Sequence, residues 1–221
     1  MNEARSKQLR ARMINEQIKT RGIANQLILS SMMDIKREDF IESYYYDVAY
    51  EDYPITIGYG QTISQPYSVA YMLDKLDLKK TDIVLEIGTG SGYVTALLSN
   101  MVKHVYSIER IEALYDRVKA KLELYSNHNI TLLFGDGYLG DQAHAPFDKI
   151  IVSAASSTIP SELVSQLKSG GKMILPVGNQ DDQDLVLIEN KNGSIHKKLL
   201  GGCRFVAMKK DILPVKKEES K

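Results

Sequence analysis

A short apolar run that ends in closely spaced glycines constrains the fold of this chain more than any other feature. Residues 83–87 (IVLEI) are typical of a buried strand, and Gly88, Gly90 and Gly92 follow directly, before a helical pattern. A strand, a glycine turn and a helix in this order are typical of nucleotide-binding proteins, because glycine permits a tight turn and lets a ligand approach the backbone. The sequence therefore predicts a ligand site at the carboxyl end of this strand.

The segments after this turn alternate between strand and helix. Strands are expected at residues 104–108, 130–134, 149–152 and 172–176, and helices at 111–124 and 161–167. Parallel strands joined through helices make right-handed crossovers, so the pattern predicts an α/β fold with a doubly wound, Rossmann-like sheet. Two further predicted strands, 184–189 and 195–208, flank Asn192-Gly193, a pair that favours a tight hairpin turn. An antiparallel hairpin is therefore expected at the C-terminal edge of the sheet.

The first 78 residues carry a different pattern. Helical periodicity predicts helices over 8–21 and 25–33 and a third helix that begins at Pro66. Residues 43–53 (SYYYDVAYEDY) lack a long period and are expected to form an ordered loop. A chain of 221 residues fits one domain. We expect it to comprise an N-terminal helical extension on the substrate side (1–78), a cofactor-binding α/β core (79–215) and a charged tail (216–221).

Composition argues against several classes of function. The chain contains 28 Lys and Arg residues and 28 Asp and Glu residues, so it has no net charge to attract nucleic acid or an anionic membrane. Its single cysteine, Cys203, excludes an internal disulfide, and its four histidines share no ligand spacing, so no metal site is expected. The N-terminus lacks a signal-peptide core, and no apolar run approaches the ~20 residues of a membrane span. We therefore expect a cytoplasmic protein that binds neither nucleic acid nor membrane.

The glycine loop favours S-adenosylmethionine over a dinucleotide. Gly88-x-Gly90-x-Gly92 lacks the G-x-G-x-x-G spacing that places a pyrophosphate at a helix N-terminus, and Tyr93 follows where that motif needs glycine or alanine. Glu86, just before the loop, would repel a pyrophosphate but suits a ligand with an ammonium and a sulfonium. An NAD-dependent oxidoreductase is therefore disfavoured.

Two further carboxylates are expected at the same edge of the sheet as Glu86. Glu109 ends the second strand, where a carboxylate can accept hydrogen bonds from ribose hydroxyls, and Asp136 follows the strand at 130–134. Each could instead cap a helix, and the glycine loop could be only a tight turn. Their agreement at one edge of a parallel sheet favours the cofactor interpretation.

At this point the chain resembles the protein-L-isoaspartate (D-aspartate) O-methyltransferase family. The resemblance runs from about Met13 to Met208 and is most specific at residues 58–66 (GYGQTISQP), because other methyltransferases share the glycine loop without this segment. Further matching blocks lie at residues 21–23, 36–40, 49–52, 135–137, 145–148, 166–171 and 175–178. The resemblance implies a class I methyltransferase fold and a monomeric protein.

The implied reaction transfers a methyl group from S-adenosylmethionine to the free α-carboxylate of L-isoaspartyl residues. Its substrates would be peptides and damaged proteins, and S-adenosylhomocysteine would be the second product; acceptance of D-aspartyl residues stays open. The methyl ester would collapse to a succinimide without help from the enzyme, which begins the repair of aged proteins.

The resemblance also implies roles by position. Ser64 matches the serine that the family treats as its active-site residue, and Val206 lies in the segment that borders the peptide site. The methionine portion of the cofactor would contact the glycine loop, the ribose Glu109, and the adenine Asp136 with Gly137. The cofactor contacts expected in this way are Gln61, Thr62, Ile63, Ser64, Glu86, Gly88, Gly90, Glu109, Asp136 and Gly137. Ala207 replaces a proline that is usual in the family, which leaves the substrate preference open.

This chemistry requires no general base. An α-carboxylate with a pKa of about 3.5 is ionised at neutral pH and is already a nucleophile. Catalysis then depends on the alignment of oxygen, methyl carbon and sulfur. Ser64 would hold one carboxylate oxygen by a hydrogen bond; the alternative is that it only caps the helix at Pro66.

Two other functions stay open. A class I methyltransferase that acts on a small molecule or another protein group would share the glycine loop but would not need the GQTISQP segment. A non-catalytic module would bind the cofactor without turnover, and the presence of Ser64, Glu109 and Asp136 disfavours it.

Overall fold

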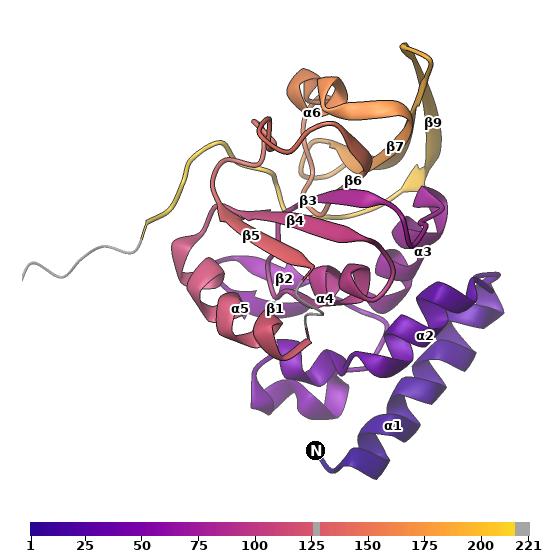
Figure 1. Ribbon diagram of the computed structural model, residues 1–221. Coiled ribbons are helices and arrows are strands. Elements are labelled where there is room, and N and C mark those ends of the chain that lie inside the picture. The colour runs from indigo at the N-terminus through magenta and orange to yellow at the C-terminus, as the bar shows by residue number, and fades with distance from the viewer. Residues whose placement is uncertain (126–128, 215–221) are drawn as a thin grey trace, which may run out of the picture.

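The computed structural model describes residues 1–125 and 129–214. Its centre is a seven-stranded sheet in the order β5-β4-β3-β6-β7-β8-β9 (Figure 1). The strands are β3 (Ile83–Ile87), β4 (His104–Glu109), β5 (Ile130–Phe134), β6 (Phe147–Val152), β7 (Leu167–Gly178), β8 (Gln183–Lys191) and β9 (Ser194–Gly202). The first five pair in parallel, and β8 and β9 are antiparallel to their neighbours. The predicted α/β class and the C-terminal hairpin are confirmed, whereas the expected tail at 216–221 lies outside the described residues.

The order of the strands creates a switch point beside β3. The chain runs from β3 outward through β4 to β5 and then returns to place β6 on the other side of β3. The connections on the two sides of β3 therefore diverge, and a crevice opens at the carboxyl ends of β3 and β6. The glycine loop begins directly after β3, so the sequence of the loop and the topology of the sheet point to the same place.

Alternating residues of the central strands pack against different layers. Val84 of β3 belongs to the core shared with the helices α3 (Pro66–Leu76), α4 (Tyr93–Ser99) and α5 (Glu112–Tyr125). Leu85 belongs to the core on the opposite face, which includes Leu163 of the short helix α6 (Ser161–Ser165). Figure 1 shows α4 and α5 on one side of the sheet and α6 on the other. Because both faces of the sheet are covered, side chains on both faces of β3 are buried, and its sequence is a nearly continuous apolar run.

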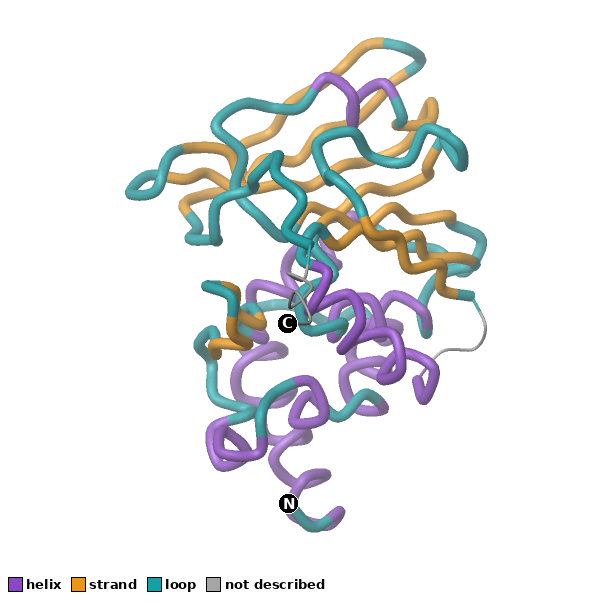
Figure 2. Tube along the Cα trace, turned by 90° about the vertical axis from the view of Figure 1, so that its left-hand side faces the viewer, coloured by secondary structure: helices purple, strands orange, loops and turns teal. Residues whose placement is uncertain are grey.

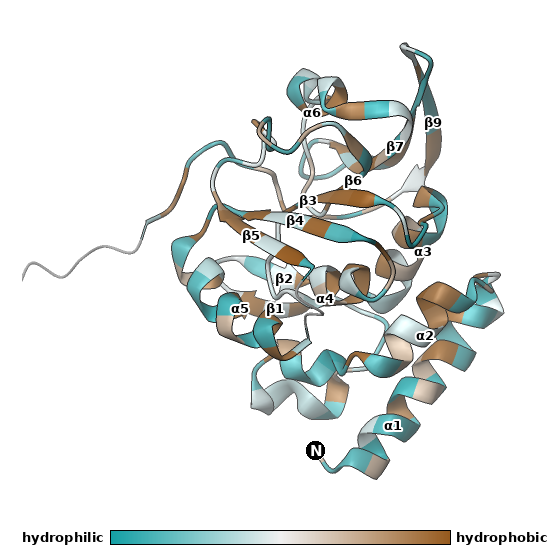
Figure 3. Cartoon of the chain, in the orientation of Figure 1, coloured by the Kyte–Doolittle hydropathy of each residue, from teal (hydrophilic) through white to brown (hydrophobic). Residues whose placement is uncertain are grey.

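The outer helices differ from the central strand in hydropathy. Strand β3 is mainly hydrophobic, whereas the outer helices α1 (Glu3–Arg12) and α5 include stretches of hydrophilic residues (Figure 3). No helix within the described residues is long and apolar enough to cross a membrane.

The first helix begins earlier than its apolar period predicts. Helix α1 starts at Glu3, because the side chain of Asn2 accepts a hydrogen bond from the backbone N–H of Arg5 at 2.9 Å. It continues through a π-helix (Met13–Ile18) and a 3₁₀ turn (Lys19–Arg21), and Gly22 ends it with a φ of 89°. The polar first turns of α1 hold few buried apolar residues, so periodicity alone misses them. The predicted second helix is α2 (Gln26–Asp34), which lies beside α1 in Figure 1.

The segment from 37 to 63 is more regular than expected. It forms 3₁₀ helices at Arg37–Phe40 and Ser43–Val48, and then a hairpin of β1 (Ile55–Gly58) and β2 (Gln61–Ile63) that the sequence did not predict. Figure 2 shows this hairpin separate from the main sheet. Residues 55–58 of β1 alternate between buried and exposed, but the strands have only four and three residues, so the alternation is too short to stand out in the sequence. The hairpin leads directly into Ser64 and α3.

The last predicted strand, 195–208, is wrong in its second half. Strand β9 ends at Gly202, and the chain leaves the sheet to cross the carboxyl ends of the central strands. The backbone N–H of Ala155 donates to Val206 O at 2.8 Å, and Met208 N donates to Ala155 O at 2.7 Å. Further on, Leu213 pairs with Ile111. We call residues 203–214 the C-terminal strap.

Candidate active site

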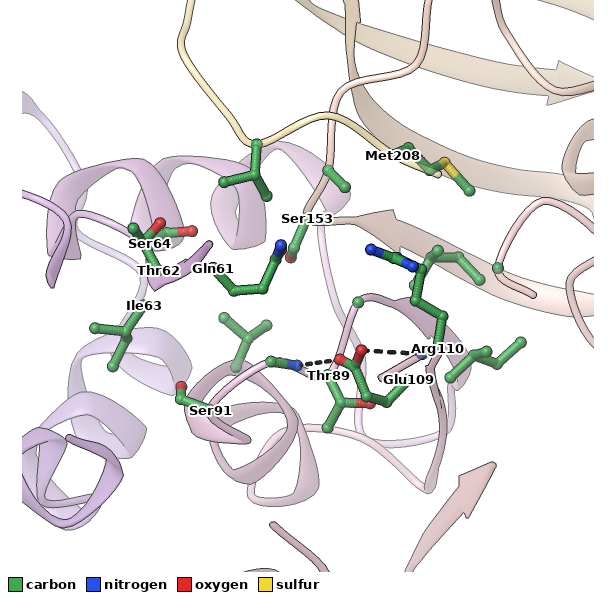
Figure 4. A pocket seen from close by; sticks show the side chains of 18 of the residues that line it. Gln61, Thr62, Ile63, Ser64, Thr89, Ser91, Glu109, Arg110, Ser153 and Met208 are labelled. Carbon is green, nitrogen blue, oxygen red and sulfur yellow. Dashed lines mark hydrogen bonds between the residues drawn. The ribbon is translucent and has the colours of Figure 1, made fainter. Parts of the chain in front are cut away.

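A pocket lies at the switch point of the sheet. About 750 Å³ of space, open solvent included, lies between its walls. Six segments form its wall: the β1–β2 hairpin with Ser64, the glycine loop after β3, the end of β4, Gly137 after β5, the end of β6, and the C-terminal strap (Figure 4). The lining residues include Gln61, Thr62, Ile63, Ser64, Gly88, Gly90, Glu109, Gly137, Ser153 and Val206.

The glycine loop packs closely against α5. At Gly92 the backbone has a φ of 86°, and an added Cβ would lie 2.7 Å from Val118 Cγ1 of α5. Only glycine therefore fits at this position. The loop backbone can approach α5 closely because of this residue, and Gly88 and Gly90 remain available to the pocket.

Glu109 is fixed in the pocket wall by the backbone. One carboxylate oxygen, Oε2, accepts a hydrogen bond from Gly90 N at 2.8 Å, and Oε1 accepts from Arg110 N and Ile111 N at 2.9 Å each (Figure 4). A carboxylate has about four acceptor sites, so Oε2, which accepts only one of these bonds, can accept a further one. Although only 4% exposed, Glu109 lines the pocket and so can receive hydroxyl groups of a ligand.

Glu86 does not line the pocket. It is 1% exposed and lies beneath the loop, where its Oε2 accepts hydrogen bonds from Thr95 Oγ1 at 2.6 Å and Ser107 Oγ at 2.7 Å. Burial raises the pKa of the Glu86 carboxyl to about 7, although these two hydrogen bonds oppose the shift. The contact expected between this side chain and a cofactor is therefore not supported by the geometry.

A chain of hydroxyls connects Glu86 to the pocket indirectly. Ser107 Oγ lies 2.7 Å from Thr89 Oγ1, and Thr89 is part of the glycine loop and of the pocket wall. Thr95 belongs to α4, the helix that the loop opens. Glu86 therefore joins β3, β4, α4 and the loop, and its role in the structure is to hold the loop in place.

Asp136 and Gly137 occupy different positions relative to the pocket. Gly137 lines it, whereas the Asp136 carboxylate lies beside it and accepts a hydrogen bond from Tyr138 N at 2.8 Å. This bond closes a local turn of the kind expected of an aspartate before glycine. The alternative that Asp136 has a local capping role is consistent with this contact.

Ser64 lies on the side of the pocket away from Glu109 (Figure 4). No residue within 1–125 or 129–214 forms a hydrogen bond with its hydroxyl, and the alternative that it caps α3 is not supported. The cap comes instead from Asp52, whose Oδ1 accepts from Tyr67 N at 3.2 Å and whose Oδ2 accepts from Gln65 Nε2 at 2.9 Å. Arg21 Nη1 also lies 2.6 Å from Asp52 Oδ2. Asp52 therefore fixes the start of α3 and leaves the Ser64 hydroxyl available.

Several pocket residues were not expected from the sequence. Ser153 follows β6, and the rule that ligands bind at the carboxyl ends of parallel strands could have found it. No local signal predicts Tyr93, whose side chain is fully buried, or Arg110, whose Nη1 donates to Asp211 O of the strap at 2.6 Å. Met208 and Lys209 reach the pocket only because the strap crosses it.

The donor set suits an organic ligand. Within the described part of the chain, no three His, Cys, Asp or Glu side chains gather in a way that could hold a metal ion. The pocket combines a fixed carboxylate at Glu109 with apolar surface from Ile87, Ile108 and Met208. A molecule with neighbouring hydroxyls and a flat apolar ring fits such a wall.

Comparison with known proteins agrees with this geometry. The sequence model of the family described as Protein-L-isoaspartate(D-aspartate) O-methyltransferase matches residues 7–212. A protein-L-isoaspartate O-methyltransferase of Dictyoglomus turgidum is 48% identical over 194 residues, which are 88% of each chain. The protein of that name from Syntrophus aciditrophicus is also 48% identical, over 89% of this chain and 92% of its own.

Solved structures give the same relationship. A structure described as a protein-L-isoaspartate O-methyltransferase superposes with a TM-score of 0.82 at 27% identity, covering 94% of this chain and 67% of the other. A Plasmodium falciparum structure described by the same activity, in complex with S-adenosyl-L-homocysteine, has a TM-score of 0.78 and 30% identity. That match covers 93% of this chain and 99% of the other.

Proposed function

The chain belongs to the protein-L-isoaspartate(D-aspartate) O-methyltransferase family, and from this premise we propose how its residues carry out the reaction. The protein is an S-adenosylmethionine-dependent methyltransferase that methylates L-isoaspartyl residues in proteins. The observation that carries the assignment of roles is that Ser64 and Glu109 line one pocket at the switch point.

The cofactor is held by the side of the pocket that Glu109 occupies. We propose that Glu109 accepts hydrogen bonds from the ribose hydroxyls, because three backbone N–H groups fix its carboxylate in the wall. Gly88 and Gly90 face the methionine portion, and Gly137 with the apolar residues Ile87 and Met208 faces the adenine. The hairpin residues Gln61, Thr62 and Ile63 cover the cofactor from the N-terminal part of the chain.

The substrate carboxylate is held by the opposite side of the pocket. We propose that the Ser64 hydroxyl donates a hydrogen bond to one oxygen of the isoaspartyl α-carboxylate. Val206 also lines the pocket, and its backbone N–H donates no hydrogen bond to the described residues, so we propose it as a second donor to the carboxylate. Two donors fix the orientation of a planar carboxylate better than one.

The reaction then needs alignment more than acid–base chemistry. S-adenosylmethionine supplies a methyl group on an electrophilic sulfonium. The isoaspartyl carboxylate has a pKa of about 3.5 in model compounds and is ionised at neutral pH, so no residue has to remove a proton. Ser64 and Val206 keep one carboxylate oxygen directed at the cofactor, and such alignment contributes roughly 7–11 kcal/mol in favourable intramolecular reactions.

The proposed reaction also implies a role in protein repair. The product ester would form a succinimide spontaneously, so the enzyme would begin the repair of aged proteins. Residues 1–78 would serve mainly the substrate side and 79–215 mainly the cofactor. The exceptions are Gln61, Thr62 and Ile63, which cover the cofactor, and Val206, which faces the substrate. We propose that the protein acts as a monomer in the cytoplasm.

The test compares two peptides that differ only in one isoaspartyl or aspartyl linkage, with labelled S-adenosylmethionine as donor. Base-labile label is expected on the isoaspartyl peptide alone. Ser64→Ala should lower kcat about a hundredfold through loss of alignment, with cofactor affinity nearly unchanged by calorimetry. The control is Ser165→Ala, an exposed serine of α6 whose hydroxyl donates only to Glu162 O. A large loss of cofactor affinity in Ser64→Ala would contradict the proposed role.

A further inference from the structure

A second cavity lies next to the active site and is not used by the roles assigned so far. About 600 Å³ of space, open solvent included, lies between α3, Leu185 of β8, the end of β9 and the first residues of the strap. Its wall includes Tyr67, Tyr71, Leu185, Leu200, Cys203 and Phe205. We call it the α3–β9 pocket.

The wall combines aromatic and apolar side chains with polar surface, and its lining also includes Ser68, Gly201 and Gly202. The rings of Tyr67 and Tyr71 lie 5.8 Å apart, one helical turn from each other on α3. The Arg21 guanidinium lies 4.5 Å from the Tyr67 ring centre, and Lys75 Nζ lies 4.8 Å from that of Tyr71. These cations stabilise the two rings by cation–π contact. Within the described residues no Asp or Glu side chain lines the cavity, so it suits an apolar or aromatic group.

The walls of the α3–β9 pocket are continuous with those of the active site. Ser64 of the active site precedes Tyr67 by less than one helical turn, and Phe205 directly precedes Val206. One pair of segments, the start of α3 and the start of the strap, therefore borders both cavities. We expect a peptide that follows these two segments away from Ser64 to reach the α3–β9 pocket.

The strap is fixed where it separates the two cavities. Phe205 N donates to Gln183 Oε1 at 2.7 Å, and Gln183 Nε2 donates to Phe205 O at 3.0 Å. The next residue is held from the other side by the bond from Ala155 N to Val206 O. The wall is therefore formed before a ligand arrives, which reduces the entropy lost on binding.

We propose that the α3–β9 pocket binds an apolar or aromatic side chain of the peptide substrate within a few residues of the isoaspartyl residue. The inference rests on the proposed function, because the position of Ser64 places the reacting carboxylate. Residues of an extended peptide are spaced by about 3.3 Å, so a side chain one to three residues from the carboxylate spans the distance of a helical turn. The enzyme would then prefer damaged sites that have an exposed apolar neighbour.

The test uses a family of isoaspartyl peptides with alanine at every flanking position. Phenylalanine, and separately glutamate, is placed at each of the three positions on either side. With the unaltered protein, phenylalanine in at least one position should lower KM roughly tenfold, since burial of such a side chain is favourable. Glutamate at that position should give no such gain.

Variants of the protein then test whether the phenylalanine side chain binds in the α3–β9 pocket. Tyr71→Ala should reduce the phenylalanine advantage to less than about twofold and leave KM for the all-alanine peptide unchanged. The matched control is Tyr115→Ala on α5, a half-buried tyrosine whose ring lies 5.8 Å from that of Phe134, and it should retain the full advantage. An advantage that is absent at every position, or that survives in Tyr71→Ala, would overturn the proposal.

The single cysteine of the chain gives a readout that does not depend on turnover. Cys203 lines the cavity, and burial raises its thiol pKa to about 11, so iodoacetamide should modify it slowly. In the presence of S-adenosylhomocysteine, the preferred phenylalanine peptide should slow this modification at least fivefold, and the all-alanine peptide should not. Equal rates with both peptides would count against binding in this cavity. If the unaltered protein methylates no isoaspartyl peptide at all, the proposed function fails and this inference falls with it.

Discussion

Replacement of Glu86 by glutamine should change how the stability of the protein depends on pH. The carboxyl is 1% exposed and its pKa is raised from 4.5 to about 7, mainly by burial. Between these pH values the folded protein binds a proton that the unfolded chain has lost, so stability falls as pH rises. The contribution is fully present below 4.5 and is lost as the pH passes about 7. Between pH 5 and pH 8 it amounts to roughly 2–3 kcal/mol.

Glu86→Gln removes this titration while keeping an oxygen for Thr95 and Ser107. The difference in unfolding free energy between the variant and the unaltered protein should therefore move by roughly 2–3 kcal/mol in favour of the variant from pH 5 to pH 8. A constant offset is expected as well, because the new amide N–H groups are buried without an assigned acceptor. The pH-dependent part of the difference is thus the quantity to measure.

Urea unfolding at half-unit steps from pH 5 to pH 8 measures this quantity directly. Glu123→Gln serves as the control, because Glu123 lies exposed on α5 and its loss should leave the curve parallel to that of the unaltered protein. Parallel curves for Glu86→Gln would show that Glu86 does not titrate in this window. The account of its burial beneath the glycine loop would then be refuted.

Two further substitutions test the supports of the site. Asp52→Ala should lower the unfolding free energy measured in urea by roughly 1–2 kcal/mol, because α3 loses its cap and Arg21 loses its ion-pair partner. The control is Glu51→Ala, at an exposed neighbouring position, which should have little effect. An equal loss of stability in both variants would contradict the capping role. Gly137→Ala should weaken cofactor binding at least tenfold by calorimetry, because the added Cβ would overlap Ile87 Cγ2 at the pocket wall. Gly135→Ala is its control, since no neighbour lies closer than 4.0 Å to the added Cβ; equal affinities for the two variants would refute the steric argument.

The sequence by itself determined the class of fold and the end of the sheet that carries the site. Residues 83–87 form a strand because a short apolar run covered on both faces has no other regular structure to adopt between a turn and a glycine loop. The same run places Glu109, at the end of the neighbouring strand, at the same edge as the loop. The GQTISQP segment indicated the family. Each of these features lies within a short stretch of sequence, so each can be recognised without the structure.

The orientation of Glu86 was decided only by the tertiary structure. Alternation along β3 places Glu86 on the same face as Val84, and the core on that face is built with α4 and α5. The sequence shows that neighbouring residues of β3 lie on opposite faces of the sheet. It does not show which face lies beneath the glycine loop and which face opens to a ligand. For that reason the sequence could not show that Glu86 lies beneath the loop, where the geometry does not support its expected contact with the cofactor.

The strap was also decided by contacts between distant segments. Residues 203–208 have the composition of a strand, but Gln183 and Ala155 hold their backbone outside the sheet. Gln183 and Ala155 precede the strap by 20 or more residues, so no pattern within a short stretch of sequence predicts these hydrogen bonds. Short-range periodicity specifies which elements form, because it reflects each element's own burial. The pocket depends on which distant elements meet, and that is settled only when the whole core packs.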